Sequence, residues 1–235
     1  MSQLNLSDAQ IFLNHLDEWM ARLPTRKLEE ISENAESIAI ICVDVTKGFC
    51  KVGALSSPRV AGIVQPIVQL MERSWDFGVR NIILSQDTHE PDAVEFGSWP
   101  AHCVRGTEEA ETVDEIRALS FFDQMLLLEK NSIASGLNQE FQEWVNDHPE
   151  VMNYIVVGDC SDLCTYQLAM FLRLDANERQ LKRNVIVPEN CVQTYDMSIA
   201  VAKEVSAYAH PGDLMHAFFL YHMALNGVEV VKAIK

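Results

Sequence analysis

The sequence is short of basic residues and has no long apolar run. Lysine and arginine total 18 against 34 aspartate and glutamate residues, which gives a formal net charge of −16. Because nucleic acids and anionic membrane surfaces are bound by basic patches, this balance argues against both as partners. The longest apolar runs, such as SIAIICVDV, are far too short to span a bilayer. We therefore expect a protein that binds neither nucleic acid nor membrane.

A secretory signal is also missing from the start, MSQLNLSDAQIFLNHLDEWM, which has acidic residues and no basic segment before an apolar block. Six cysteines in 235 residues without such a signal are typical of the reducing cytoplasm, where thiols stay free. Low-complexity tracts are absent, and hydrophobic residues make up 48% of the chain. We expect a cytoplasmic protein that is long enough to bury a sizeable core.

Short β-rich runs alternate with longer amphipathic stretches. The pattern predicts a helix over residues 7–22 and a nearly continuous apolar strand over 38–45, followed by the strand-like runs NIILSQD, QMLLLEK, YIVVGD and NVIVPE. Such alternation is typical of the α/β class. We predict one domain over residues 36–235, with about six mainly parallel strands flanked by helices in a Rossmann-type three-layer arrangement. Residues 1–35 would form an N-terminal helical extension.

Ionisable or reactive residues close several of these predicted strands. They are Asp44, Asp87, Lys130 and the turn that contains Cys160 and Cys164. Each has an ordinary alternative, since aspartate is common in turns and a lysine at a strand end usually reaches solvent. However, ligands of parallel α/β sheets bind outside the carboxyl ends of the strands. The convergence at these ends therefore indicates a functional site.

The stretch YIVVGDCSDLCTYQLA places Cys160 and Cys164 where an apolar strand gives way to a helix. Both could be small core residues, the most frequent role of a free cysteine. A metal site is disfavoured, because C-x₃-C is not a usual zinc spacing and no second pair follows. In the third interpretation Cys164 is a nucleophile in the first helical turn, where unpaired amides and the helix dipole favour a thiolate. Lys130 would then lower the thiol pKa and Asp44 would shuttle its proton.

The segment QDTHEPDAVEFGSWPAHCVRGT indicates a metal site. Asp87 and His89 alternate, so both can face one side of an extended chain, and His102 returns after a loop that holds Glu95. One carboxylate and two imidazoles suit Zn²⁺, Fe²⁺ or Mn²⁺, and Glu95 would add a fourth ligand. Ordinary loop residues are the alternative. The metal interpretation is favoured because the strand that ends in Asp87 is expected to lie beside the strand that leads to Asp44.

Taken together, these motifs resemble the isochorismatase-like cysteine hydrolases, and within them the nicotinamidases. The resemblance covers roughly residues 36–235. It rests on four segments in family order: VDVTKGFCKVGAL, QDTHEPD with WPAHCVRGT, LLLEKNS and VVGDCSDLCTYQLA. Each motif alone is weak, but their joint order at successive strand ends is specific, and it overturns the core interpretation of Cys164.

The resemblance implies a catalytic triad of Asp44, Lys130 and Cys164. It also implies a cis peptide bond before Cys160, so that the backbone N–H groups of Cys160 and Cys164 form an oxyanion hole. Phe49 would pack against the substrate ring.

The activity implied by the resemblance is the deamidation of nicotinamide to nicotinate and ammonia through a thioester, a step of NAD salvage. One divalent metal ion, most typically Zn²⁺ with Fe²⁺ or Mn²⁺ as alternatives, would bind Asp87, His89, Glu95 and His102 and orient the pyridine ring. The partner would be a small amide, and the protein would form a homo-oligomer.

Departures from the family pattern leave the substrate open. Thr46 and Thr88 replace a glutamine and an aromatic residue that are common in the family, and Glu95 stands in for a histidine of the metal loop. A related cysteine amidase for a carbamoyl compound, maleamate or a modified nicotinamide is therefore the second hypothesis. A non-catalytic binding protein is the third, although nothing in folding requires an intact Asp–Lys–Cys set.

Overall fold

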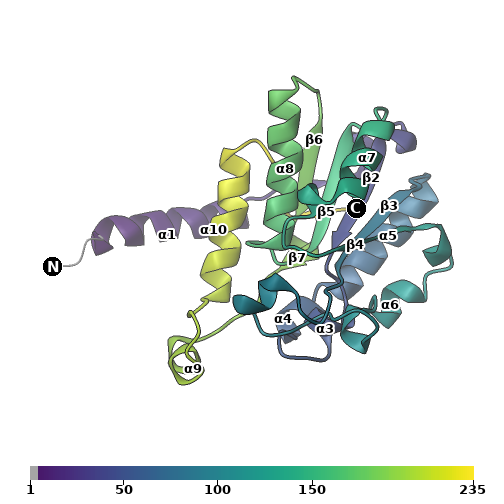
Figure 1. Cartoon of the computed structure of the whole chain (residues 1–235). Coiled ribbons are helices and arrows are strands. Elements are labelled where there is room, and N and C mark those ends of the chain that lie inside the picture. Colours follow the sequence, from purple (N-terminus) through teal and green to yellow (C-terminus); the bar gives the residue numbers. More distant parts are fainter. Residues whose placement is uncertain (1–4) are drawn as a thin grey trace.

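The computed structural model describes residues 5–235, so residues 1–4 of the expected N-terminal extension lie outside the described part. A seven-stranded parallel sheet with the order β4-β3-β2-β5-β6-β8 forms the centre, and β7 pairs with β5 (Figure 1). Its strands are β2 (Ile38–Val43), β3 (Asn81–Asp87), β4 (Leu126–Lys130), β5 (Asn153–Asp159), β6 (Asn184–Pro188), β7 (Val192–Gln193) and β8 (Glu229–Val231). The predicted α/β fold is confirmed.

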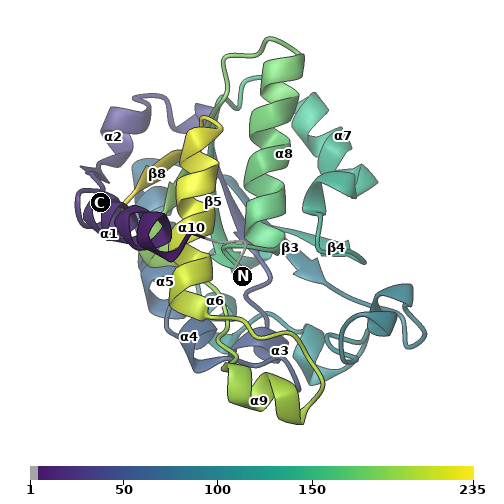
Figure 2. The ribbon, with the colours of Figure 1, turned by 90° about the vertical axis from the view of Figure 1, so that its left-hand side faces the viewer.

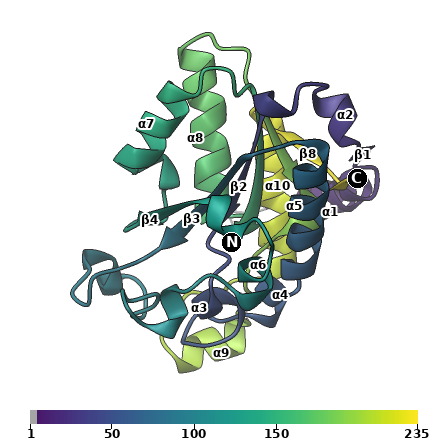
Figure 3. The same cartoon turned by 90° about the vertical axis from the view of Figure 1, so that its right-hand side faces the viewer.

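Helices cover both faces of this sheet, as Figures 2 and 3 show from opposite sides. The helices from α2 onward are α2 (Leu28–Ile31), α3 (Lys47–Cys50), α4 (Pro58–Ala61), α5 (Val64–Phe77), α6 (Asp114–Arg117), α7 (Gln139–Asp147), α8 (Cys164–Glu178), α9 (Ile199–Glu204) and α10 (Gly212–Leu225). Short 3₁₀ helices are η1 (Ala35–Ser37), η2 (Val94–Gly97), η3 (Glu108–Ala110), η4 (Phe122–Gln124), η5 (Ser135–Leu137) and η6 (Glu189–Cys191).

Strand β2 shows why the sheet needs two helical layers. Every residue of this strand is buried, because its neighbours β3 and β5 flank it and helices cover both of its faces. Ile38 and Ile40 belong to the core on the side of α5, whereas Ile41 belongs to the core that contains α7, α8 and α10. A strand covered on both faces is apolar throughout rather than alternating. The continuous apolar run in the sequence therefore marks the middle of the molecule.

The N-terminal segment forms a long helix, α1 (Leu6–Ala21), whose expected bounds were residues 7–22. This helix packs on α10, where the ring of Tyr221 lies edge-on to Phe12 and Trp19 with centroids 5.5 and 5.2 Å away. Strand β1 (Thr25–Arg26) then pairs in parallel with β9 (Ala233–Ile234), so the extension is tied to the end of the chain. Within residues 5–235, no helix is long and apolar enough to cross a membrane.

Two boundaries differ from the sequence prediction at the carboxyl edge of the sheet. The strand expected over residues 38–45 ends at Val43, because Asp44 adopts a left-handed conformation with φ of 55°. A non-glycine residue in this region turns the chain out of the strand and is uncommon. The helix whose first turn was expected to contain Cys164 begins at Cys164 itself, after a turn that follows β5. Both differences lie where the reactive residues gather.

Candidate active site

Three neighbouring strands bring Asp44, Asp87 and Lys130 together. Asp87 and Lys130 end β3 and β4 in register, and Asp44 follows β2. The Lys130 Nζ atom lies 2.8 Å from Asp44 Oδ2 and also donates a hydrogen bond to Asp87 Oδ1. The backbone N–H of Asp87 donates to Asp44 Oδ1 at 2.8 Å. All three side chains are buried, so the ammonium lies between two carboxylates away from water.

Cys164 completes this group from the end of the turn that follows the next strand, β5. It is the first residue of α8, its side chain is only 6% exposed, and its Sγ atom lies within 4.8 Å of carboxylate oxygens of Asp44 and Asp87. The structure therefore brings together all three predicted catalytic residues. All six cysteines are free, as the sequence predicts.

The turn before Cys164 has an unusual backbone. The peptide bond between Asp159 and Cys160 is cis, as the resemblance implies. Gly158 has φ of +116°, and a Cβ atom on it would lie 2.0 Å from the carbonyl oxygen of Val43 in the adjacent strand. Only glycine fits this conformation and this close approach. The glycine therefore lets β5 run against β2 up to the turn that presents Cys164.

The turn leaves two amides available for a ligand. The N–H groups of Leu163 and Thr165 both donate to the carbonyl of Cys160 at 3.1 Å, which closes the turn. Within residues 5–235, the N–H groups of Cys160 and Cys164 donate no hydrogen bond to another residue. The first amides of a helix have no intrahelical acceptor and attract negative charge. Both predicted oxyanion donors are thus present and free.

Burial and the neighbouring charges set the protonation state of the group. Burial, reinforced by the charge of Asp87 and opposed by Lys130, raises the pKa of Asp44 to about 6. Although burial acts in the opposite direction, the charge of Lys130 and the nearby imidazoles of His102 and His89 hold the pKa of Asp87 far below its usual range. The pKa of Lys130 is raised well above its ordinary value, because the two carboxylates outweigh burial. At neutral pH the site therefore holds two carboxylates and one ammonium.

The thiol of Cys164 does not follow the sequence expectation of a lowered pKa. Burial raises its pKa well above the ordinary value, and Lys130 only partly opposes this effect. A helix N-terminus and a nearby ammonium favour a thiolate, but removing a charge from water costs more at a fully buried position. The resting group is consequently a thiol beside an ionised Asp44, which is arranged to accept its proton.

The predicted metal ligands also converge. Each of the four residues offers one donor atom, and these atoms all lie within 4.8 Å of one another. The residues are Asp87, His89, Glu95 and His102. The Nε2 atoms of His89 and His102 are each 3.7 Å from Asp87 Oδ2, which is too long for a hydrogen bond. Two ligands of a tetrahedral zinc ion lie roughly 3.4 Å apart. The separations therefore fit a shared divalent cation better than direct contacts between the side chains.

Two of these donor atoms are buried without a hydrogen-bond partner, namely His89 Nε2 and Glu95 Oε1. Buried polar atoms are rarely left unsatisfied, so the pair supports a bound cation. The other nitrogen of each histidine is held in place: His89 Nδ1 lies 2.7 Å from Asn131 Oδ1 and His102 Nδ1 lies 2.8 Å from the carbonyl of Pro100. These contacts direct both Nε2 atoms into the cluster.

Asn131 is a site residue that the sequence analysis missed. Its only sequence signal is its position directly after Lys130, at the end of β4. A single asparagine in a loop carries no pattern that relates it to His89, 42 positions earlier in the chain. Phe49, which is predicted to pack against the substrate ring, is 8% exposed, and its ring lies 5.5 Å from that of His102.

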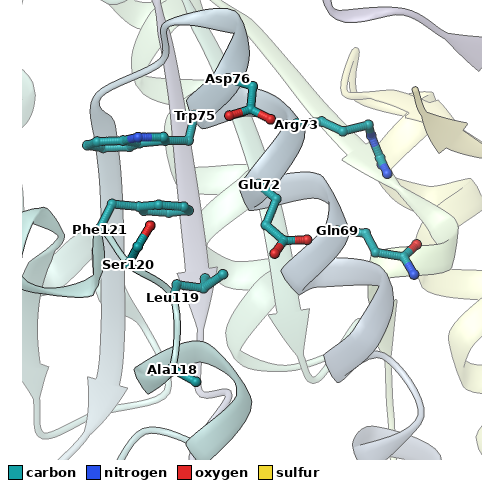
Figure 4. Close-up of a pocket in the computed structure, with 9 residues that line it drawn as sticks. All are labelled: Gln69, Glu72, Arg73, Trp75, Asp76, Ala118, Leu119, Ser120 and Phe121. Carbon is teal, nitrogen blue, oxygen red and sulfur yellow. The ribbon is translucent and has the colours of Figure 1, made fainter.

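A surface hollow of about 570 Å³ lies elsewhere, between α5 and the segment that precedes β4 (Figure 4). The rings of Trp75 and Phe121 stack at its edge with centroids 4.4 Å apart. Its lining shares no residue with the cluster around Cys164, so we do not assign the substrate to it. Its lining residues are Gln69, Glu72, Arg73, Trp75, Asp76, Ala118, Leu119, Ser120 and Phe121.

Known proteins share both the sequence pattern and the fold. Nicotinamidase 1 of Arabidopsis thaliana is 28% identical over 239 residues, which cover 93% of this chain and 95% of the relative. The pyrazinamidase of Pyrococcus horikoshii, solved in complex with zinc, superimposes with a TM-score of 0.64 at 18% identity, covering 83% of this chain and 99% of that one. The N-carbamoylsarcosine amidase of Thermoplasma acidophilum gives a TM-score of 0.63 at 21% identity, covering 83% and 96%.

One protein family matches this chain over most of its length. Residues 38–233 match the family described as the Isochorismatase domain. This range begins with β2 and ends in β9, so it contains the entire central sheet and every residue of the site. The chain therefore belongs to the isochorismatase family.

Proposed function

We propose that this protein hydrolyses nicotinamide to nicotinate and ammonia through a thioester on Cys164. The observation that carries the proposal is the junction of two sites at Asp87. Its Oδ1 atom accepts a hydrogen bond from Lys130 of the acid–base group, and its Oδ2 atom faces both histidines of the metal cluster. A substrate that fits this junction needs a carboxamide at one end and a ligand for a divalent cation at the other. Nicotinamide, with its ring nitrogen, meets both requirements.

The first half of the proposed reaction forms the thioester. Asp44 takes the thiol proton of Cys164 while the sulfur attacks the carboxamide carbon. The free amides of Cys160 and Cys164 hold the resulting oxyanion. Asp44 then gives its proton to the departing nitrogen, the C–N bond breaks, and ammonia leaves. A pKa of about 6 suits Asp44 to both steps near neutral pH.

The second half hydrolyses the thioester. Asp44, again ionised, takes a proton from water as the oxygen attacks the same carbon in front of the same two amides. The C–S bond breaks, the sulfur recovers the proton from Asp44, and the acid gives its remaining proton to solvent and leaves as nicotinate. Lys130 keeps its charge throughout and stabilises whichever of Asp44 and the sulfur is negative.

Asp87, His89, Glu95 and His102 would hold the divalent cation, which we propose to be zinc. When bound, such an ion supplies a Lewis-acidic contact for the ring nitrogen. The ring would lie beside Phe49, whose side chain borders His102. The role of the cluster is therefore to orient the substrate, and the bond changes stay with Asp44, Lys130 and Cys164.

The test is ammonia release from nicotinamide by the zinc-loaded enzyme, with nicotinate identified by chromatography. Cys164→Ala should lower the rate by at least about 10³-fold, because the nucleophile is lost. Cys191→Ala is the matched control, since Cys191 is equally buried but takes no part in the site, and its activity should stay close to wild type. Failure of the metal-replete wild type to release ammonia would contradict the proposal. In that case a panel of carbamoyl compounds, maleamate and modified nicotinamides would test the related-amidase alternative.

A further inference from the structure

The turn that presents Cys164 is held by two buried histidines from the C-terminal part of the chain. His210 lies between α9 and α10, and its Nε2 atom is 2.6 Å from Asp162 Oδ2. His216, on α10, lies with its Nδ1 atom 2.9 Å from the hydroxyl of Ser161. Ser161 and Asp162 are two of the three residues inside the turn between Cys160 and the start of α8. Among the hydrogen bonds and ion pairs of residues 5–235, neither histidine is paired with a residue assigned to catalysis or to the metal.

The hydrogen bonds of His210 determine its protonation state. Its Nε2 atom faces the carboxylate of Asp162, and its Nδ1 atom lies 2.9 Å from the backbone carbonyl of Tyr195. Both partners accept hydrogen bonds, so both ring nitrogens must carry a proton, as in an imidazolium. The ring also stacks on Tyr195, with centroids 3.9 Å apart, and only 7% of the residue is exposed. His210 is thus a buried cation with a fixed orientation.

Asp162 depends on this cation. It is 4% exposed, and His210 is the only basic side chain of residues 5–235 that forms an ion pair with it. Its surroundings are acidic, because the buried side chains of Asp44, Asp87 and Asp159 close the neighbouring strands. A buried charge without a partner is costly and acts on nearby groups through a low dielectric. Without His210, the turn beside the nucleophile would carry an uncompensated negative charge.

We propose that His210 is a positioning residue for the reaction, acting through Asp162 to fix the turn of Cys164 and to neutralise its charge. The idea rests on the proposed function only in taking Cys164 as the nucleophile. His216 serves as the internal comparison. It holds the adjacent residue of the same turn, but it makes a hydrogen bond to a hydroxyl group and lies 4.0 Å from Glu189 Oε1. His216 therefore helps to fix the shape of the turn, and its hydrogen bond to a hydroxyl group does not require a positive charge.

The experiment compares His210→Gln, Asp162→Asn and the double variant, with His216→Gln as the matched control. The first readout is the rate at which iodoacetamide alkylates Cys164 at pH 7.5, followed by mass spectrometry of its peptide. Because alkylation requires the thiolate, His210→Gln should slow it about tenfold through the unpaired carboxylate. The other five cysteines should stay protected, which shows that the fold is retained. The double variant removes that carboxylate, and its rate should return to within about threefold of Asp162→Asn alone.

The second readout is turnover of nicotinamide by the zinc-loaded enzyme. His210→Gln should lower kcat by about 10- to 100-fold with little change in KM, as expected when a reacting group is misplaced but the substrate contacts remain. His216→Gln should change kcat by less than about threefold. An alkylation rate like that of wild type in His210→Gln, or a double variant no faster than His210→Gln, would overturn the proposal.

A third measurement protects the test against variants that fail to fold. In wild-type protein labelled with ¹⁵N-histidine, both ring nitrogens of His210 should show the NMR shifts of protonated nitrogen at pH 7.5. A neutral His210 would overturn the proposal without any variant. Alkylation and NMR need no substrate, so their expected results together with a wild type inactive on nicotinamide would reject only the proposed function.

Discussion

At the scale of single residues, Lys130 carries much of the electrostatic balance of the site, because its ammonium lies between the buried carboxylates of Asp44 and Asp87. Lys130→Met would leave both carboxylates without this cation. Removing one partner of a buried ion pair typically costs about 3–5 kcal/mol. We expect a loss of that order in the free energy of unfolding measured in urea, together with loss of turnover. Lys232→Met, which breaks the surface pair with Glu189, is the control and should cost less than about 1 kcal/mol. Equal effects of the two substitutions would contradict this account.

Asn131 gives a second prediction at this scale. Its side-chain oxygen orients His89 from the nitrogen opposite the metal cluster. Loss of such a contact typically weakens metal binding by about 10- to 100-fold. Asn131→Ala should therefore raise the Kd for zinc by this factor, measured by competition with a chromophoric chelator. Ser132→Ala, at the next position, should leave the Kd unchanged. A wild-type Kd in Asn131→Ala would show that His89 is oriented without it.

At the scale of elements, the nucleophile turn contacts one histidine before α10 and one on α10, and opposite pH dependences are predicted for the two. Burial lowers the pKa of His210, but the hydrogen bond and charge of Asp162, the carbonyl of Tyr195 and the charge of Asp196 raise it overall. The stabilisation is therefore complete below about pH 6.5, the ordinary histidine value, and is lost as the pH rises through the higher folded value. The advantage of wild type over His210→Gln in free energy of unfolding should shrink as the pH rises above about 6.5.

His216 provides the control of opposite sign. Burial, as the largest cause, lowers its pKa, so its neutral form is favoured by folding. Protonation then destabilises the folded state, and the advantage of wild type over His216→Gln should shrink as the pH falls below about 6.5. Urea titrations at several pH values measure both trends. Parallel trends for the two variants would contradict the assigned charge states.

The elements also show what the sequence can and cannot predict. Apolar runs located the central strands, and strand ends located Asp87 and Lys130, because a sheet covered on both faces requires such runs. The left-handed turn at Asp44 was not predicted, since it depends on contacts with β3 rather than on local propensity. The contacts of His210 and His216 were missed as well. Their partners lie 48 and 55 positions away, and the sequence carries no periodic signal across such separations.

At the scale of the whole molecule, the metal cluster joins the loop over residues 88–106 to the central sheet. Asp87 ends β3, whereas Glu95 and His102 belong to this irregular loop. A ligand that binds only the folded state stabilises it by about 2.7 kcal/mol at a concentration 100 times its Kd. We expect Tm to rise on addition of zinc, measured by calorimetry, and to fall again with a chelator. His102→Ala should abolish most of this rise, and a rise of wild-type size would contradict the assigned ligands.

The central claim is that a sulfur atom at the N-terminus of α8 becomes covalently attached to the acyl group of the substrate. The most direct measurement is mass spectrometry of zinc-loaded enzyme quenched with acid within milliseconds of mixing with nicotinamide. The account predicts an added nicotinoyl group on the peptide that contains Cys164, present in wild type and absent from Cys164→Ala. Steady turnover of nicotinamide with no adduct on Cys164, or with the adduct on another residue, would contradict it.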